Sequence, residues 1–217
     1  MRRFFFALPR RDRPVPHLEL PLMASKAYAA IMNVSQLLLD KGFEPQNVSE
    51  ALGQVGAALD VDRVYIFENS KAADGKLLCS QRYEWTAAST SAQLDNPELQ
   101  NVPYDEVLPS WVPPLSSGQV VKGHPRDFAS PARELLESQD IRSLLVCPIT
   151  LGGEWWGFVG FDDCRTERAW PTAESAVLQA LSNALAGSLR HARLRSALSG
   201  VQTQLRAIIE RCASTTS

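Results

Sequence analysis

Two apolar segments separated by a pair of glycines constrain the fold of this chain more than any other feature. Residues 143–150 and 155–162 are each long enough to form a strand. Gly152 and Gly153 lie between them and accept the positive φ angles of a tight turn. The sequence therefore predicts a β-hairpin over residues 143–162.

The second strand of this hairpin carries large apolar side chains on both of its faces. Strict alternation predicts one face with Trp155, Gly157, Val159 and Phe161, and an opposite face with Trp156, Phe158, Gly160 and Asp162. The two strand glycines leave room where another backbone or a ligand can approach. We expect this hairpin to form the centre of an antiparallel sheet that is covered on both sides.

The segments before the hairpin change from a helical period to a strand period. Residues 25–40 and 45–59 carry apolar residues at spacings of three and four, which predicts two amphipathic helices. Residues 63–68 are rich in β-branched and aromatic residues and predict a strand. The turn at Asp74-Gly75 leads to a partner strand over 76–86. Alternation places Leu77, Cys79, Gln81, Tyr83 and Trp85 on one face of that strand.

The middle of the chain, residues 87–140, is rich in proline and lacks a strong period. A stretch of this length inside a compact domain is typical of a binding or lid region. Short helices are predicted at 108–118 and 130–138, with a brief strand at Val120-Val121.

A long helix is predicted from Thr172 past Arg211. Its first part has an apolar seam at Leu178, Leu181 and Leu185. A second seam of heptad spacing, out of phase with the first, consists of Leu194, Leu198, Val201, Leu205 and Ile208. We expect the first part to pack on its own domain and the second part to pair with a partner helix in a homodimer.

Together these elements give an α+β chain, and at this point its residues resemble a known family. The runs 141–149 (IRSLLVCPI) and 153–164 (GEWWGFVGFDDC) look like the hairpin of GAF domains from bacterial multi-sensor signalling proteins. The likeness covers roughly residues 27–198. It implies an antiparallel sheet of five or six strands, with helices on one face and a ligand-sized pocket beneath the middle segment on the other.

Family members differ in their ligands, and three ligand classes are disfavoured by the residues present. The spaced signature of cyclic-nucleotide-binding members cannot be assembled, since Asp105-Glu106 has no preceding Asn-Lys. Covalent bilin attachment in phytochrome-like members commonly uses a Cys followed by His, and no cysteine here is followed by His. For haem, only His124 is a candidate axial ligand. The ligand is left unknown.

No catalytic constellation is found in the sequence. Gly-x-Ser-x-Gly, phosphate-loop, metalloprotease and dinucleotide motifs are absent, as are kinase motifs, and no cysteine has zinc-ligand spacing. We therefore expect no metal and no enzyme. One alternative is a redox enzyme resembling free methionine sulfoxide reductases, in which Cys164, beside Arg165, would be the reactive thiol. A second alternative is a ligand-free dimerisation scaffold.

Candidate pocket residues follow from alternation and from position along the chain. They are Phe67, Trp85, Trp111, Phe128, Cys147 and Phe158. Ordinary core packing competes with ligand contact at each of them, because buried aromatic residues commonly fill such sheets.

The sequence suggests three regions. Residues 1–21 are expected to be a flexible basic tail, with weak docking to an anionic membrane as the alternative; 22–190 a sensory domain; and 191–217 a helical extension. The net charge of −2 and sequence pI near 6.0 argue against nucleic-acid binding. We expect a cytoplasmic chain without a membrane-spanning segment that binds a small molecule or partner and signals through its last helix. A downstream PAS or kinase domain is the expected recipient.

Overall fold

A computed structural model describes the backbone of residues 16–215 and the side chains of residues 25–206. Most of the expected tail, and the side chain of Ile208, lie outside these ranges. The first helix, α1 (Pro16–Lys41), begins before the predicted start at Ser25. Pro16 suits the first turn of a helix, because proline fixes φ near the helical value and the N–H that it lacks would be unpaired there. No helix among the described residues is both long enough and apolar enough to cross a membrane.

Six strands form one sheet in which every neighbouring pair is antiparallel, in the order β3-β2-β1-β6-β5-β4. Their bounds are β1 Arg63–Lys71, β2 Leu77–Thr86, β3 Val102–Pro103, β4 Val121–Gly123, β5 Ser143–Leu151 and β6 Glu154–Asp163. The predicted hairpin is β5–β6, and β6 pairs with β1 at the centre of the sheet. The predicted α+β fold with a six-stranded antiparallel sheet is confirmed.

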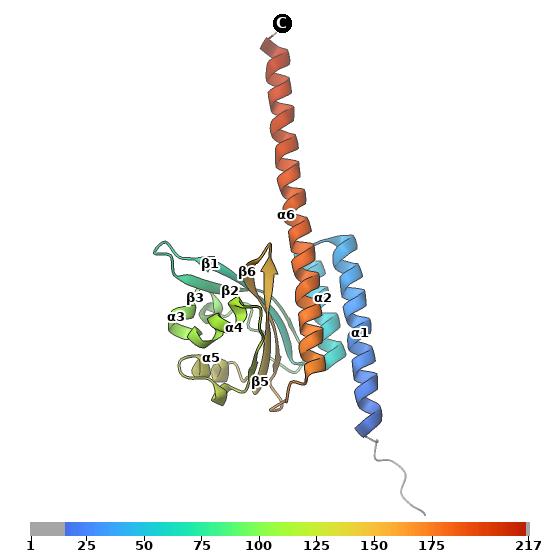
Figure 1. Ribbon diagram of the computed structural model, residues 1–217, viewed down its shortest axis with the longest axis vertical. Helices are drawn as coiled ribbons and strands as arrows, with labels where there is room; N and C mark the ends of the chain where they lie inside the picture. The colour runs from blue at the N-terminus through green and yellow to red at the C-terminus, as the bar shows by residue number, and fades with distance from the viewer. Residues whose placement is uncertain (1–15, 216–217) are drawn as a thin grey trace, which may run out of the picture.

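Two helices lie on one face of the sheet, α2 (Pro45–Leu59) and α6 (Thr172–Thr215), and α1 packs against both of them (Figure 1). Their apolar stripes bury a core against alternate residues of β1, β5 and β6. Leu178, Leu181 and Leu185 of α6 are fully buried there, so the first seam packs on its own domain as expected.

The proline-rich middle segment covers the opposite face (Figure 1). It consists of short pieces: η1 Pro97–Leu99, α3 Tyr104–Val107, η2 Pro109–Trp111, α4 Val112–Ser116, η3 Pro125–Asp127 and α5 Ala132–Ser138. A second apolar core forms between these pieces and the sheet. The two-sided cover predicted from the hairpin is therefore present, with helices on one side and the middle segment on the other.

Irregularities in both hairpins change which face some side chains occupy. The register between β1 and β2 shifts after Ile66, where Arg82 is the extra residue of a β-bulge. A bulge of one residue reverses the alternation beyond it. Gln81 therefore faces the middle segment, whereas Tyr83 and Trp85 face the helices. The single face predicted for all the odd-numbered residues of this strand is corrected.

A second shift, between Ile149 and Thr150, acts on the tip of β6. Trp155 and Trp156 do point to opposite faces, as predicted, but their assignment is exchanged. Trp155 packs beside the middle segment, 5.1 Å between ring centroids from Tyr104, and Trp156 packs on the helix side.

The glycines in β6 have the role that the sequence suggested for them. A Cβ atom on Gly157 would lie 2.1 Å from the backbone carbonyl oxygen of Phe67, and one on Gly160 would lie 2.5 Å from the ring of Tyr65. Both distances are too short for any side chain. Close approach of the neighbouring strand and its aromatic ring therefore requires glycine at these positions.

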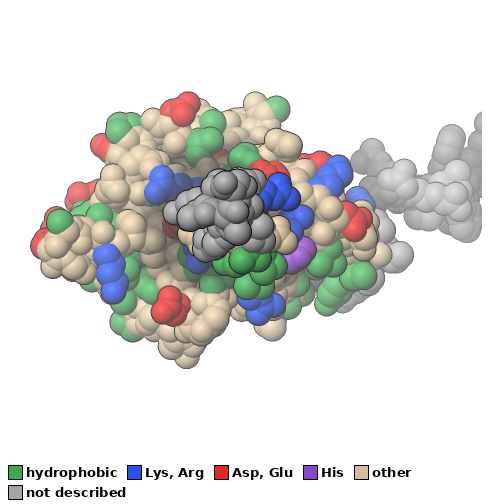
Figure 2. All heavy atoms as spheres, turned by 90° about the horizontal axis from the view of Figure 1, so that it is seen from above, with side chains coloured by type: hydrophobic (Ala, Val, Ile, Leu, Met, Phe, Trp, Pro, Cys, Tyr) green, Lys and Arg blue, Asp and Glu red, His purple; other side chains and the backbone are tan. Residues whose placement is uncertain are grey.

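The second half of α6 projects beyond the domain (Figure 1). Its heptad seam is exposed, with Leu194, Leu198, Val201 and Leu205 retaining 57–63% of their accessible surface. Figure 2 views the molecule down this helix and shows hydrophobic side chains beside it.

Candidate functional site

A cavity lies between the central strands and the middle segment. Six apolar side chains that line it are Phe67, Leu99, Val102, Leu108, Ile141 and Phe158. The space open to the centres of water molecules is about 40 Å³. That is room for about three waters at 10–15 Å³ each. The cavity as it stands suits a small ligand.

Charged and polar groups form one end of this cavity. The buried guanidinium of Arg63 donates from Nη2 to the backbone oxygen of Gln139 at 2.5 Å, and its Nε lies 3.4 Å from Oδ2 of Asp162. The hydroxyl of Tyr65 donates to Oδ1 of Asp162 at 2.9 Å. These groups come from the ends of β1 and β6 that lie side by side, where Arg63 is opposite Asp162.

Burial sets the protonation of this cluster. Removal from water raises the pKa of Asp162 to about 7, although Arg63 and Tyr65 both act to lower it. The pKa of Tyr65 is raised well above its ordinary value by burial and by the neighbouring carboxylate. Burial lowers the pKa of Arg63, but attraction to Asp162 and Cys164 outweighs it, so the guanidinium remains charged.

Four buried polar atoms of residues lining the cavity have no hydrogen-bond partner among the described residues. They are Arg63 Nε, Gln81 Nε2, Glu84 Oε1 and Trp111 Nε1. The sheet supplies the first three and η2 supplies the fourth. Buried polar atoms without a partner are uncommon because each carries a desolvation cost.

The structure brings together some of the six predicted pocket residues. Phe67, Trp111 and Phe158 line the cavity, with the rings of Phe67 and Phe158 stacked at 4.8 Å between centroids. Phe128 lies behind Trp111, at 5.9 Å between ring centroids.

The other two predicted pocket residues lie on the opposite face of the sheet. Trp85 packs against Gly53 and Gly56 of α2, because the bulge in β2 turns it toward the helices. Cys147 lies in the helix-side core, where its Sγ is 3.2 Å from Oε1 of Gln179 in α6. In β5 the neighbouring Val146 takes the position facing the middle segment instead.

Sequence reasoning missed the polar residues of the cavity: Arg63, Gln81, Glu84 and Asp162. A signal was present for two of them. Arg63 and Asp162 are charged residues at the ends of otherwise apolar strands, a position that commonly marks a paired or functional charge. For Gln81 and Glu84, the side of the sheet depends on the bulge, which alternation alone does not locate.

Cys164 lies beside the polar end of the cavity, where Nη2 of Arg63 donates to its sulfur at 3.0 Å. Burial nevertheless raises the pKa of this thiol to about 11, although Arg63 acts to lower it. A thiol with such a pKa carries little thiolate near neutral pH, and the thiolate is the nucleophile. The raised pKa therefore gives no support to Cys164 as a reactive cysteine.

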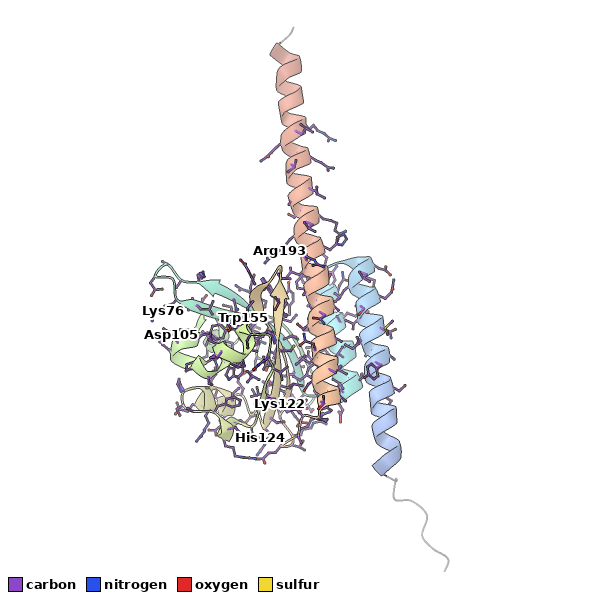
Figure 3. All side chains as sticks on the ribbon, in the orientation of Figure 1. Lys76, Asp105, Lys122, His124, Trp155 and Arg193 are labelled. Atoms are coloured by element: carbon purple, nitrogen blue, oxygen red, sulfur yellow. The ribbon has the colours of Figure 1, made fainter. Side chains whose placement is uncertain are left out.

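His124 lies at the end of the domain away from the projecting part of α6 (Figure 3). Its Nδ1 is 3.0 Å from Oδ2 of Asp127, a contact within the same turn. Among the described residues, no three His, Cys, Asp or Glu side chains gather closely enough to hold a metal ion.

Comparison with known proteins agrees with this architecture. The family model described as GAF domain matches residues 46–189, and the chain therefore belongs to the GAF domain family. The chain is 35% identical over 193 residues to the methanogenesis regulatory histidine kinase FilI of Methanothrix harundinacea, an alignment that covers 88% of this chain and 20% of FilI. The chain thus spans about a fifth of the length of that relative.

Solved structures with the same fold include GAF domains that hold bilins. One is the phycocyanobilin-bound GAF domain from a cyanobacterial phytochrome, with a TM-score of 0.63 and 17% identity, covering 78% of this chain and 96% of that one. Another is the far-red absorbing dark state of a protein with bound biliverdin. It has a TM-score of 0.58 and 16% identity, and the match covers 79% of this chain and 99% of that one.

These structures overturn the expectation that bilins are disfavoured as ligands. That expectation relied on the residue after each cysteine, which bears on one form of covalent attachment and not on the capacity of the fold. Structures of the same fold hold phycocyanobilin and biliverdin, so the exclusion is wrong.

Proposed function

We propose that this chain is the sensory part of a signal-transduction protein, in which a small molecule bound in the cavity alters self-association through α6. The main supporting observation is the division of α6 into two parts. Its first part is buried against the domain, and the same helix continues without a break into an apolar seam exposed to solvent. A ligand changes such an equilibrium only if it binds one state more tightly than the other.

The sheet offers a physical connection between the cavity and α6. Strand β5 presents Val146 to the middle-segment core and Cys147 to the helix-side core. On the α6 side, the hydroxyl of Ser182 donates to the backbone oxygen of Pro148 at 2.6 Å. A shift of β5 on ligand binding would therefore be transmitted to α6 through direct contacts.

Two exposed apolar stripes supply a surface for a second copy of the chain. One is the heptad seam of α6. The other lies on α1, where Tyr28, Met32 and Leu39 retain 60–70% of their accessible surface. Exposed apolar residues that recur along a helix are typical of a helical interface, because pairing removes them from water. The proposed assembly is a homodimer.

The wider setting of the module follows from its relative. FilI is a histidine kinase, and this chain matches about a fifth of it. We take residues 22–190 as the sensory domain and residues 191–217 as the helical extension toward a kinase or PAS output domain in the cytoplasm.

Sedimentation of the full chain tests the dimer. Leu198→Glu places a charge in the seam and is expected to yield monomer, because a buried unpaired carboxylate is costly. Ser199→Glu adds the same charge at the adjacent exposed position and is the matched control, expected to remain dimeric. Wild-type chain that sediments as a monomer would refute the dimer. A dimer whose dissociation constant is unchanged by every cavity ligand would indicate a scaffold.

A further inference from the structure

The four unpartnered atoms of the cavity have a definite chemical composition. Three are N–H donors, on Arg63, Gln81 and Trp111, and one is an acceptor, Oε1 of Glu84. The side chains of Arg63, Gln81 and Trp111 belong to residues that are only 1–4% exposed. Nε of Arg63 is already ion-paired with Oδ2 of Asp162 at 3.4 Å, so a molecule that satisfies the other three atoms must carry both a hydrogen-bond acceptor and a donor.

Glu84 is held in place with one oxygen left free. Its Oε2 accepts hydrogen bonds from the backbone N–H groups of Gln93 at 2.7 Å and Leu94 at 3.0 Å. These contacts fix the carboxyl group at the edge of the cavity, while the buried Oε1 has no partner among the described residues. A charged donor such as an ammonium group forms a stronger hydrogen bond with a carboxylate oxygen than a neutral donor does.

The balance of charge in the cavity disfavours a purely anionic ligand. Two carboxyl groups, those of Glu84 and Asp162, line the cavity with a single guanidinium, that of Arg63. The free N–H groups of Gln81 and Trp111 can still accept a carboxylate if the ligand brings its own positive charge. The remaining lining is aliphatic and aromatic, which suits an apolar body.

We propose that the ligand of this cavity is a small zwitterion, an α-amino acid with an apolar side chain. This inference rests on the proposed sensory function and specifies its ligand. The ammonium group binds Oε1 of Glu84, and the carboxylate accepts from Nε2 of Gln81 and Nε1 of Trp111 in the positive field of Arg63. The apolar side chain packs between Phe158 and Leu108, which requires the short helices of the middle segment to move outward, because the free space of about 40 Å³ holds only about three waters.

Titration calorimetry on the full chain tests the inference with L-leucine, L-methionine and L-phenylalanine as probes. Isopentylamine lacks the carboxylate of leucine, isocaproate lacks its ammonium group, and glycine lacks its apolar body. Each of these three is expected to bind at least about tenfold more weakly than leucine, the factor expected for loss of one charged hydrogen bond or of a buried aliphatic side chain. Equal affinity for leucine and either truncated analogue would overturn the proposal.

Variants of the lining residues separate a binding role from a structural one. Glu84→Gln is expected to weaken leucine binding at least about tenfold while leaving isocaproate unaffected. Gln81→Leu removes an unpartnered polar atom, so it should weaken leucine binding without lowering the melting temperature of the free chain. Glu154→Gln, on the same sheet but exposed and outside the cavity, is the matched control. A lowered melting temperature with unchanged affinity would show a structural role and overturn the proposal.

A further binding measurement distinguishes failure of this inference from failure of the proposed sensory function. Biliverdin serves as a probe of another class. Suppose that biliverdin binds with an affinity that Trp111→Ala changes, and that no amino acid binds. The proposal of a zwitterionic ligand is then wrong, and the sensory function stands. If no amino acid binds the wild-type chain and no other probe binds either, the cavity holds water only and the inference fails. The dimer measurement then decides the sensory function separately.

Discussion

Asp162 is the residue whose chemistry depends most on its surroundings. It is almost fully buried between Arg63 and Tyr65, and removal from water raises the pKa of its carboxyl group to about 7. In the unfolded chain the same group has a pKa near 3.9. Between these two values the folded chain binds a proton that the unfolded chain has lost. The contribution of Asp162 to stability is therefore full below about pH 4 and is lost as the pH rises toward 7.

Replacing this carboxyl group is expected to remove that pH dependence. The free energy of unfolding of the wild-type chain, minus that of Asp162→Asn, should fall by about 1.4 kcal/mol per pH unit between about pH 4 and pH 7 and level off above. Urea unfolding of the two proteins at a series of pH values measures both free energies. Asp74→Asn, in the exposed turn between β1 and β2, is the control. A difference that stays constant with pH would contradict the raised pKa.

For single residues, the sequence predicted where the backbone packs closely, but it did not predict which face of the sheet the polar side chains occupy. Gly157 was singled out because a glycine in an apolar strand suggests close approach, and the carbonyl of Phe67 occupies the space beside it. Gln81 and Trp85 were assigned by alternation, and one extra residue in β2 reverses that assignment for part of the strand. Nothing in the residue types of a strand marks which residue will be the extra one.

The predicted elements were more reliable than the faces that they present. The hairpin β5–β6 was identified from its length, its glycine turn and its apolar character on both sides, and these features depend on no distant contact. The cavity depends on how the short pieces of the middle segment fold back over the sheet. These pieces have weak periods of their own, so their positions follow from packing and not from local sequence.

Gly200 weakens the part of α6 that projects from the domain. Glycine in a helix interior costs about 1 kcal/mol relative to alanine, and a Cβ atom at this position would meet no other atom within 4 Å. If the projecting part is ordered by pairing, both copies gain from Gly200→Ala. The dimer dissociation constant is then expected to fall between about 5-fold and 30-fold, as sedimentation equilibrium would show.

Gly187→Ala is the control for that substitution. Gly187 lies in the part of α6 that packs on the domain, and it too has open space at its Cβ position. Its replacement should raise the melting temperature and leave the dimer constant unchanged. Equal effects of the two substitutions on dimerisation would mean that the projecting seam is not the site of pairing.

The molecule as a whole places a cavity between the sheet and the middle segment. The candidate dimer helix α6 lies on the opposite face of the sheet from that segment (Figure 1). Strand β5 and the end of β6 contact both sides, so a rearrangement on one face can reach the other through the sheet. If the chain binds a ligand and dimerises as proposed, the two equilibria form a single thermodynamic system. The two effects are linked, because both routes lead from free monomer to liganded dimer.

This reciprocity gives a prediction that requires no knowledge of the output domain. If dimerisation changes the affinity of each cavity for its ligand by some factor, typically about 5-fold to 150-fold for coupled sites, then saturating ligand must change the dimer dissociation constant by the square of that factor, because the homodimer holds two cavities. Calorimetry on the wild-type dimer and on the Leu198→Glu monomer gives the change in ligand affinity. Sedimentation with and without ligand gives the change in the dimer dissociation constant. Ser199→Glu should behave as the wild-type chain in both. Identical ligand affinities in monomer and dimer would show that α6 receives no signal from the cavity.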